Sequence, residues 1–294
     1  MQPQATRLGC AIFGTAGAKR VHDRAMQCDA RRSVPPSFVP ALVVRERNDR
    51  CAMLAVAPLN EIGPKWDIAF RGISTERCGM PNKRKGRDFI ARHGETVFNI
   101  ARRMQGDHPH TPLTRAGFAQ ADAMGAALRE MLGSRPKLTL WASSAGRALQ
   151  TLAIIAEHLE LDWHQARTDD RLIEIGMGRW SGRYYADLER EVGPFLDPEH
   201  GLYSRPPEGG EWYDAIAARV SGWLADTADD PGDRLVIMHG MSSRILRGVM
   251  TGRDVLPQFN APVAPDLPQG SIVRIEAGVE TVVHLGTGRG AAPA

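Results

Sequence analysis

Short apolar runs alternate along this chain with longer stretches in which apolar side chains recur every three or four positions. Three runs, at residues 89–91, 138–142 and 235–238, have the length of buried strands and are too short for helices. The helical spacing between and around them follows a different period. It predicts helices between Thr114 and Gly133, at 145–159, at 211–226 and around 245–250.

This alternation of strands and helices predicts βαβ units and an α/β fold with a mostly parallel central sheet. Two further apolar runs, at 271–275 and 281–285, predict closing strands joined through Ala277-Gly278. The remaining segments are less regular. We expect a short helical piece within 95–104, a loop at 105–113, a short apolar piece at 171–176 and irregular chain at 183–210.

Residues 1–80 show neither the helical nor the strand spacing of apolar side chains over any sustained length. Prolines at positions 35, 36 and 40 oppose a helix there. Short strands at 41–44 and 53–56 are conceivable but have no layered surroundings. We therefore predict a poorly ordered extension over 1–82 and a folded domain over 83–294. A sharper hypothesis is that Met80 is the true initiator, which a peptide from before Met80 in the natural protein would contradict.

Charge and cysteine are placed unevenly along the chain. The net charge is +3, and residues 1–80 hold 12 Lys/Arg and 7 Asp/Glu, so residues 81–294 carry no excess of basic side chains. A nucleic-acid-binding domain would show such an excess. All four cysteines lie in residues 1–80, at spacings of 18, 23 and 27 that match no zinc pattern. A disulfide framework stays open for an exported chain, while the cysteine-free remainder fits an intracellular enzyme.

No run approaches the 18 apolar residues that would indicate a membrane-spanning helix. Residues 8–18 resemble a weak export signal, and the arginine-rich start also resembles an organelle transit peptide. Glycines interrupt the apolar stretch, so we expect a cytoplasmic protein without membrane or nucleic-acid partners.

Two predicted strands end in the same kind of residue. Arg92-His93-Gly94 follows the strand at 89–91, and His239-Gly240 follows the strand at 235–238. Ligands of open α/β sheets bind at the carboxyl ends of the strands, so these two imidazoles are expected side by side in a ligand site. Glycine after the histidine allows a sharp turn and a close approach of the ligand to the main chain.

An ordered set of motifs over residues 87–276 resembles the histidine phosphatase superfamily, the clan that includes cofactor-dependent phosphoglycerate mutase. The resemblance implies a three-layer α-β-α sandwich of the phosphoglycerate mutase type, with 83–294 as its catalytic domain. The matching residues are Arg92-His93-Gly94-Glu95-Thr96, Asn99, Gln105-Gly106, Thr111-Pro112-Leu113-Thr114, Gly117, Gln120-Ala121, Ser143-Ser144, Arg147-Ala148, Thr151, Glu174, Gly209-Gly210-Glu211 and His239-Gly240.

The resemblance implies that His93 is the nucleophile and forms a phosphohistidine. Arg92, Arg147 and His239 would surround the phosphoryl oxygens, which guanidinium groups pair with bidentately. The two arginines also disfavour protonation of His93 and so keep it nucleophilic. Glu174 would protonate the leaving oxygen and then take a proton from water.

Four further positions match family residues that contact the phosphate or its ester. They are Asn99, Gln105, Gly106 and Gly240. For Asn99 a helix-capping role is an equal alternative, and Ser143 and Ser144 are either bystanders or partners of Arg147. His108 and His110 have no accompanying carboxylates, so a solvated loop is favoured over a metal site. His110 replaces the acidic residue usual before this Thr-Pro-Leu-Thr, which leaves the anchoring of the loop open.

The family contains both phosphatases and mutases. A mutase needs extra cations and a lid that excludes water, whereas Arg183, Arg190 and Arg205 are scattered here and the span from Glu174 to Gly210 is short. We therefore predict a phosphomonoester hydrolase acting on a small phosphorylated metabolite. Phosphoglycerate mutase is the alternative, and a non-catalytic phospho-ligand-binding protein is a third.

No cofactor and no metal is implied, and a homodimer stays open. The leaving-group pocket is expected to involve the aromatic and apolar residues after Glu174, for each of which packing is an equal alternative. They are Trp180, Tyr184, Tyr185, Leu188 and Trp212.

Overall fold

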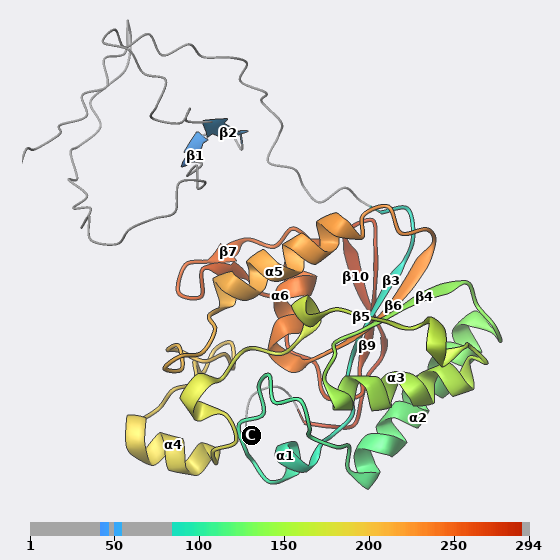
Figure 1. Ribbon diagram of the computed structural model, residues 1–294, viewed down its shortest axis with the longest axis horizontal. Helices are drawn as coiled ribbons and strands as arrows, with labels where there is room; N and C mark the ends of the chain where they lie inside the picture. The colour runs from blue at the N-terminus through green and yellow to red at the C-terminus, as the bar shows by residue number, and fades with distance from the viewer. Residues whose placement is uncertain (1–41, 47–49, 55–83, 290–294) are drawn as a thin grey trace, which may run out of the picture. The chain divides into compact units, whose positions relative to one another are not determined.

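The computed structural model describes residues 42–46, 50–54 and 84–289 (Figure 1). The chain divides into two units, Met1–Glu76 and Arg77–Ala294. In the first, β1 (Leu42–Glu46) and β2 (Arg50–Leu54) form an antiparallel pair in which Leu42 lies opposite Leu54. These strands overlap the two short runs at 41–44 and 53–56. The predicted lack of order in the rest of 1–82 lies outside the described residues.

The second unit is built on one six-stranded sheet with the order β10-β9-β3-β6-β4-β5. β3, β6, β4 and β5 are parallel, and β9 and β10 add an antiparallel edge, so the sheet is mostly parallel as predicted. The hairpin between the last two strands turns at Ala277 and Gly278, which both have positive φ. The strands are β3 (Asp88–Arg92), β4 (Leu138–Ala142), β5 (Arg167–Thr168), β6 (Asp233–Met238), β9 (Ile272–Glu276) and β10 (Val279–His284).

Successive side chains of the central strands enter two different cores, because a strand alternates its faces at every residue. Phe89 and Ala91 of β3 face one core, and Ile90 faces the other. Both faces are therefore buried, which explains why the central strands are almost continuously apolar rather than alternating. The first core lies under α2 (Arg115–Leu132) and α3 (Gly146–His158), and the second lies under α5 (Tyr213–Asp226) and α6 (Gly240–Met250), as Figure 1 shows.

The helix α2 begins and ends as the sequence predicted. The Thr114 side chain accepts a hydrogen bond from the Gly117 amide at its start, and Gly133 ends it with a φ of 75°. The glycine inside its apolar stripe has a packing reason. A Cβ on Gly125 would lie 2.5 Å from Cδ2 of His158 on α3, so the glycine lets the two helices approach closely.

Several predicted segments differ from the structure. Only α1 (Val97–Ile100) of the expected piece 95–104 is helical, because Arg102 takes a left-handed backbone with a φ of 53°. The stretch 183–210 is not wholly irregular, since it contains α4 (Tyr185–Val192). The apolar piece at 171–176 overlaps the 3-10 turn Asp170–Leu172. The other short elements are the 3-10 turns Trp163–Gln165 and Gly178–Trp180, and the pair β7 (Val255–Leu256) and β8 (Ala261–Pro262).

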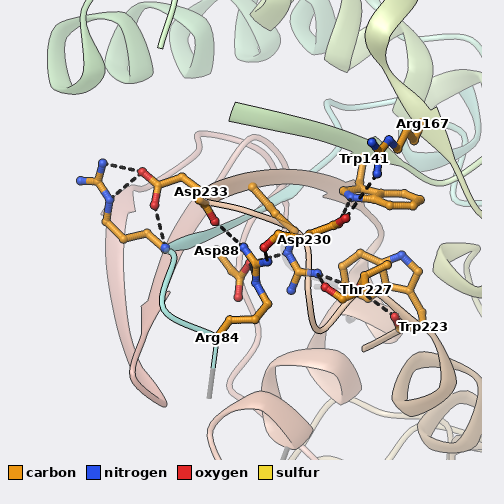
Figure 2. Close-up of polar contacts among 11 residues, drawn as sticks. Arg84, Asp88, Trp141, Arg167, Trp223, Thr227, Asp230 and Asp233 are labelled. Carbon is orange, nitrogen blue, oxygen red and sulfur yellow. Dashed lines mark hydrogen bonds and ion pairs between the residues drawn. The ribbon is translucent and has the colours of Figure 1, made fainter. Parts of the chain in front are cut away.

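Figure 2 shows a polar network around Asp88, which begins β3, whereas His93 follows the carboxyl end of the same strand. The fully buried Arg234 donates from Nε to Asp88 at 2.6 Å and from Nη1 to the Thr227 hydroxyl at 2.7 Å. The Arg84 side chain contacts Asp88 and the carbonyl of Asp230. The Arg84 side chain is therefore only 6% exposed, although it belongs to a run of basic residues.

Candidate active site

The site is formed where the parallel strands end. β3 delivers Arg92 and His93, and β6 delivers His239, which is the residue before α6. Arg147 comes from the first turn of α3, and Glu174 comes from the chain that follows the 3-10 turn Asp170–Leu172. The structure thus brings together all five side chains for which the sequence predicted a catalytic role.

His93 is buried, with 2% of its surface exposed, and its ring is held in one tautomer. Nδ1 lies 2.7 Å from the carbonyl oxygen of Gly94, which can only accept, so Nδ1 carries the proton. Nε2 is then unprotonated, and its lone pair accepts a hydrogen bond from Nε of Arg147 at 3.3 Å. Burial and the charges of Arg147 and Arg92 lower the pKa of His93 well below its usual value. His93 is therefore a neutral imidazole with an unprotonated Nε2 at neutral pH.

His239 lies beside His93, with 5.1 Å between the ring centroids. Its Nδ1 accepts a hydrogen bond from Nε of Arg147 at 3.1 Å, so its proton is on Nε2, which donates to the Ser143 hydroxyl at 2.7 Å. Burial, followed by the Arg147 charge, lowers the pKa of His239 well below its usual value. Ser143 is thus a partner of His239 rather than of Arg147, and Ser144 contacts Asp170 instead.

Arg147 is fully buried and ties the site to the loop that follows α1. Its Nη2 donates to the carbonyl of Gly106 at 2.7 Å, and its Nη1 donates to the carbonyl of His108 at 2.8 Å and to the Thr111 hydroxyl at 3.1 Å. These bonds anchor the loop without an acidic residue at position 110. Burial lowers the pKa of Arg147 to about 10, so the guanidinium stays protonated at neutral pH.

Arg92 is held from the opposite side of the site. Its Nη1 donates to the carbonyls of Leu267, at 2.5 Å, and of Arg289, at 3.2 Å, and lies 3.8 Å from Asp266. Burial lowers the pKa of Arg92 from its ordinary value.

The carboxylate of Glu174 lies on the N-terminus of α6. Oε1 accepts hydrogen bonds from the amides of Ile175 at 2.9 Å and Ser242 at 2.8 Å, and Oε2 accepts one from Met241 at 2.9 Å. A helix N-terminus presents unpaired amides and a partial positive charge, which fit a carboxylate. Glu174 is therefore fixed beside the two histidines by backbone rather than by side chains.

Asn99 and Gln105 both line the cavity, and Asn99 also caps α1. Oδ1 of Asn99 accepts a hydrogen bond from the backbone amide of Thr96 at 3.0 Å, and the backbone amide of Asn99 donates to the Thr96 hydroxyl. The structure therefore shows the capping role of Asn99, and its contact with a phosphate or ester stays a prediction. Gly106 has a φ of 47°, and a Cβ there would lie 2.1 Å from Cγ of Met177, so only glycine fits.

A cavity of about 80 Å³ opens above these groups. Of the residues expected in the leaving-group pocket, Tyr185 lines it, whereas Trp180 and Leu188 are buried in the core. Trp212 lines a separate, shallower hollow that also contacts Glu174. The lining residues of the cavity are Arg92, His93, Phe98, Asn99, Arg102, Arg103, Gln105, Gly106, Glu174, Ile175, Tyr185, Tyr203, Gly240, Met241, Gln269 and Arg289.

Several lining residues were not predicted from the sequence. Arg102 and Arg103 are separated from the Gln105-Gly106 motif by Met104 alone, so their position was a signal that could have been used. Gln269 and Arg289 had no such signal, because the chain before β9 brings Gln269 to the site and the chain after β10 brings Arg289 there. The described residues contain no group of three or more His, Cys, Asp or Glu side chains placed to hold a metal ion.

Comparison with known proteins gives consistent matches over this domain. A family model described as histidine phosphatase superfamily (branch 1) matches residues 89–287. A relative from Salmonella paratyphi C named "probable phosphoglycerate mutase" is 34% identical over 167 residues, which is 56% of this chain and 74% of the relative. A glucosyl-3-phosphoglycerate phosphatase from Mycobacterium tuberculosis is 32% identical over 168 residues, 53% of this chain and 71% of the relative.

Solved structures agree on the fold. A mycobacterial glucosyl-3-phosphoglycerate phosphatase in complex with VO3 superposes with a TM-score of 0.57 at 25% identity, covering 69% of this chain and all of that one. An alpha-ribazole phosphatase from Shigella flexneri superposes with a TM-score of 0.52 at 23% identity, covering 71% of this chain and 98% of that one, and shows the fold alone. No helix in the part of the chain that the structure describes is long and apolar enough to cross a membrane.

Proposed function

Because the chain belongs to the histidine phosphatase superfamily, we propose that it is a phosphomonoester hydrolase that works through a phosphohistidine at His93. The observation that carries this proposal is the state of His93. Its imidazole is neutral, its Nε2 lone pair is unprotonated, and it lines the cavity together with Arg92 and Glu174.

In the first step, the phosphoryl oxygens of the bound ester take over the hydrogen bond that Nε of Arg147 donates to His93, and the released lone pair on Nε2 attacks the phosphorus. The N–P bond forms while the ester P–O bond breaks, and the leaving oxygen takes a proton from the carboxyl group of Glu174. Arg92 and Arg147 stabilise the charge on the transferring phosphoryl group. His239 does not line the cavity, and it acts through Arg147, to whose Nε its Nδ1 is bonded.

In the second step, water attacks the phosphoryl group and gives a proton to Glu174. The N–P bond breaks, inorganic phosphate leaves, and the imidazole of His93 returns to its neutral form. The backbone amides that hold Glu174 keep its carboxylate in place between the two steps.

The His93→Ala variant tests this mechanism. We expect loss of at least about 1,000-fold in the hydrolysis of p-nitrophenyl phosphate, since no other nucleophile replaces the imidazole. The wild-type enzyme should yield an acid-labile, alkali-stable phosphoenzyme in a rapid quench, and the variant should not. His164→Ala is the matched control, because His164 is exposed and only its backbone amide makes a hydrogen bond. Hydrolysis retained in His93→Ala would exclude the mechanism.

Phosphoglycerate mutase is the second candidate, supported by the relative from Salmonella paratyphi C. The arginines of the segment after Glu174 argue against it. Arg179, Arg183 and Arg190 pair with carboxylates, Arg205 donates to the Pro194 carbonyl, and none of the four lines the cavity. Conversion of 3-phosphoglycerate to 2-phosphoglycerate that exceeds phosphate release would favour the mutase.

We also propose that the enzyme acts on a small phosphorylated metabolite in the cytoplasm. The cysteine-free domain that carries the site supports an intracellular location. Cell fractionation with an antibody to the natural protein checks this proposal.

A further inference from the structure

Glu174 lies in a short piece of irregular chain rather than in a helix or a strand. This piece follows the 3-10 turn Asp170–Leu172 and precedes the 3-10 turn Gly178–Trp180. A general acid has to lie within hydrogen-bond distance of the leaving oxygen. The position of the Glu174 carboxylate therefore depends on the contacts that hold the backbone of its neighbours.

Both backbone groups of Gly176 bond to one residue, Glu211. The Glu211 amide donates to the Gly176 carbonyl at 2.8 Å, and the Gly176 amide donates to Oε2 of Glu211 at 3.3 Å. A Cβ on Gly210 would lie 2.6 Å from the same carbonyl oxygen, so the two backbones approach each other closely here. Glu211 thus holds the chain two residues after Glu174.

Arg219 of α5 extends this contact to the other side of Glu174. Its Nε donates to Oε1 of Glu211 at 2.7 Å and its Nη2 donates to Oε2 at 3.0 Å, which is the bidentate geometry of a strong ion pair. Its Nη1 donates to the carbonyl of Arg171 at 2.5 Å, three residues before Glu174. The pair of Glu211 and Arg219 therefore holds the chain both before and after the carboxylate.

The pair lies close to Glu174 but outside the cavity that receives the substrate. The side chains of Glu211 and Arg219 are 20% and 16% exposed, so solvent screens their attraction less than that of a surface pair. Both line the separate hollow that Glu174 also borders, and neither lines the cavity beside His93. An influence of the pair on the reaction therefore has to pass through Glu174.

We propose that Glu211 and Arg219 are positioning residues for the proton transfer by Glu174. This inference rests on the proposed phosphatase function, in which Glu174 protonates the leaving oxygen. Without the pair the chain around Glu174 can shift, and a misplacement of about 1 Å costs up to about 100-fold in rate. The bonds that hold His93 and Arg147 involve neither residue, so phosphoryl binding and nucleophilic attack are expected to stay as they are.

Two aryl esters of similar shape separate this role from a general loss of structure. The p-nitrophenolate ion leaves without a proton, whereas phenol, whose hydroxyl has a pKa of about 10, leaves slowly unless it is protonated. For both esters kcat/KM reports the first phosphoryl transfer, starting from free enzyme and substrate. In Glu211→Ala we expect kcat/KM to fall about tenfold for phenyl phosphate and to stay within about twofold of the wild type for p-nitrophenyl phosphate.

Glu211→Gln gives a second form of the test. Its side-chain oxygen can still accept from the Gly176 amide, although the pair with Arg219 loses its negative charge. We expect it to lose less of the kcat/KM for phenyl phosphate than Glu211→Ala does. Glu208→Ala is the matched control, because Glu208 is 70% exposed, pairs with Arg179 and lines neither hollow. It removes the same charge three residues earlier and should leave the ratio of the two kcat/KM values as in the wild type.

The effect of Glu211 should disappear once the group that it positions is removed. Glu174→Gln has no acidic proton to donate, so adding Glu211→Ala to it should not change the ratio of the two kcat/KM values further. Hydrogen exchange provides a readout that does not depend on activity. The amides of residues 174–177 should exchange faster in Glu211→Ala than in the wild type, and at the wild-type rate in Glu208→Ala.

An equal loss for both esters in Glu211→Ala, or an unchanged ratio, would overturn the positioning role while hydrolysis by the wild type still supports the phosphatase. A further change of the ratio in the double variant would also overturn it, since the effect would then not pass through Glu174. If the wild type hydrolyses neither ester, the proposed function fails and the exchange rates decide separately. Faster exchange of 174–177 in Glu211→Ala then supports Glu211 as the residue that holds this segment, and unchanged exchange removes it.

Discussion

At the scale of single residues, one arginine sets the state of two histidines. Nε of Arg147 donates toward Nε2 of His93 and Nδ1 of His239, so the two imidazoles carry their protons on different nitrogens. His93 donates its ring proton from Nδ1 to the Gly94 carbonyl, and His239 donates its ring proton from Nε2 to the Ser143 hydroxyl. This arrangement leaves Nε2 of His93 unprotonated, because the single ring proton is held on Nδ1 by the Gly94 carbonyl.

The lowered pKa values of His93 and His239 predict a pH-dependent stability. In the unfolded chain both imidazoles titrate at about 6.5, whereas the folded protein resists their protonation. As pH falls below 6.5, the unfolded chain therefore binds more protons and the free energy of unfolding decreases. The expected slope is up to about 1.4 kcal/mol per pH unit for each histidine.

Urea unfolding between pH 7.5 and 5.5 measures this slope. His93→Asn and His239→Asn should each remove about half of the histidine contribution, while His164→Ala should leave the slope as it is. If the double variant kept the wild-type slope, the loss of stability would have to come from other groups.

At the scale of elements, the amino-terminal end of β3 and β6 is joined by the buried pair of Asp88 and Arg234 (Figure 2). Arg234 also lies over the Trp223 ring, with its Cζ 4.6 Å from the centroid, which links the sheet to α5. The network lies at the opposite end of the strands from His93, so it bears on stability rather than on chemistry.

Asp88→Asn is expected to destabilise the protein by about 3–5 kcal/mol, because it leaves the charge of Arg234 buried without its carboxylate. Arg190→Gln removes an exposed pair with Asp187 and should change stability by about 0–1 kcal/mol. Chemical denaturation of both variants gives the comparison. A loss for Asp88→Asn as small as for the control would mean that Asp88 contributes little to the network.

Elements that local signals mark were predicted correctly, whereas elements that depend on distant contacts were not. The strand at 138–142 and the helix ending at Gly133 were predicted correctly, because a buried apolar run and a glycine with positive φ are local signals. α4 was missed and the helix in 95–104 was predicted too long. The ends of these two elements meet in the hydrogen bond from the Tyr185 amide to the Arg102 carbonyl, which joins residues 83 positions apart and which periodicity does not record.

At the scale of the whole molecule, the cavity-lining residues that the structure describes all lie between Arg92 and Arg289. We therefore expect a fragment of residues 80–294 to retain the kcat/KM of the full chain for p-nitrophenyl phosphate within about twofold. A fragment of residues 88–294 lacks Arg84 and Arg87, which bond to the Asp230 carbonyl and to Asp233, and should unfold at lower denaturant concentration. Loss of activity in the longer fragment would show that the first unit is needed for catalysis.

The sequence alone determined the α/β class and the family, which the family model and the solved relatives confirm. It also placed Arg92, His93 and His239 at strand ends, since burial and strand length are written in the local order of residues. The roles of these residues stay predictions that the variants above test.

Only the tertiary structure decided how these groups work together. It directed Arg147 to both histidines and to the loop at Gly106, placed Glu174 on the N-terminus of α6, and brought Arg289 to Arg92 across 197 residues of chain. The physical reason is that such contacts depend on where the chain path returns. A pattern of apolar spacing records which face of an element is buried but not which distant side chain it meets.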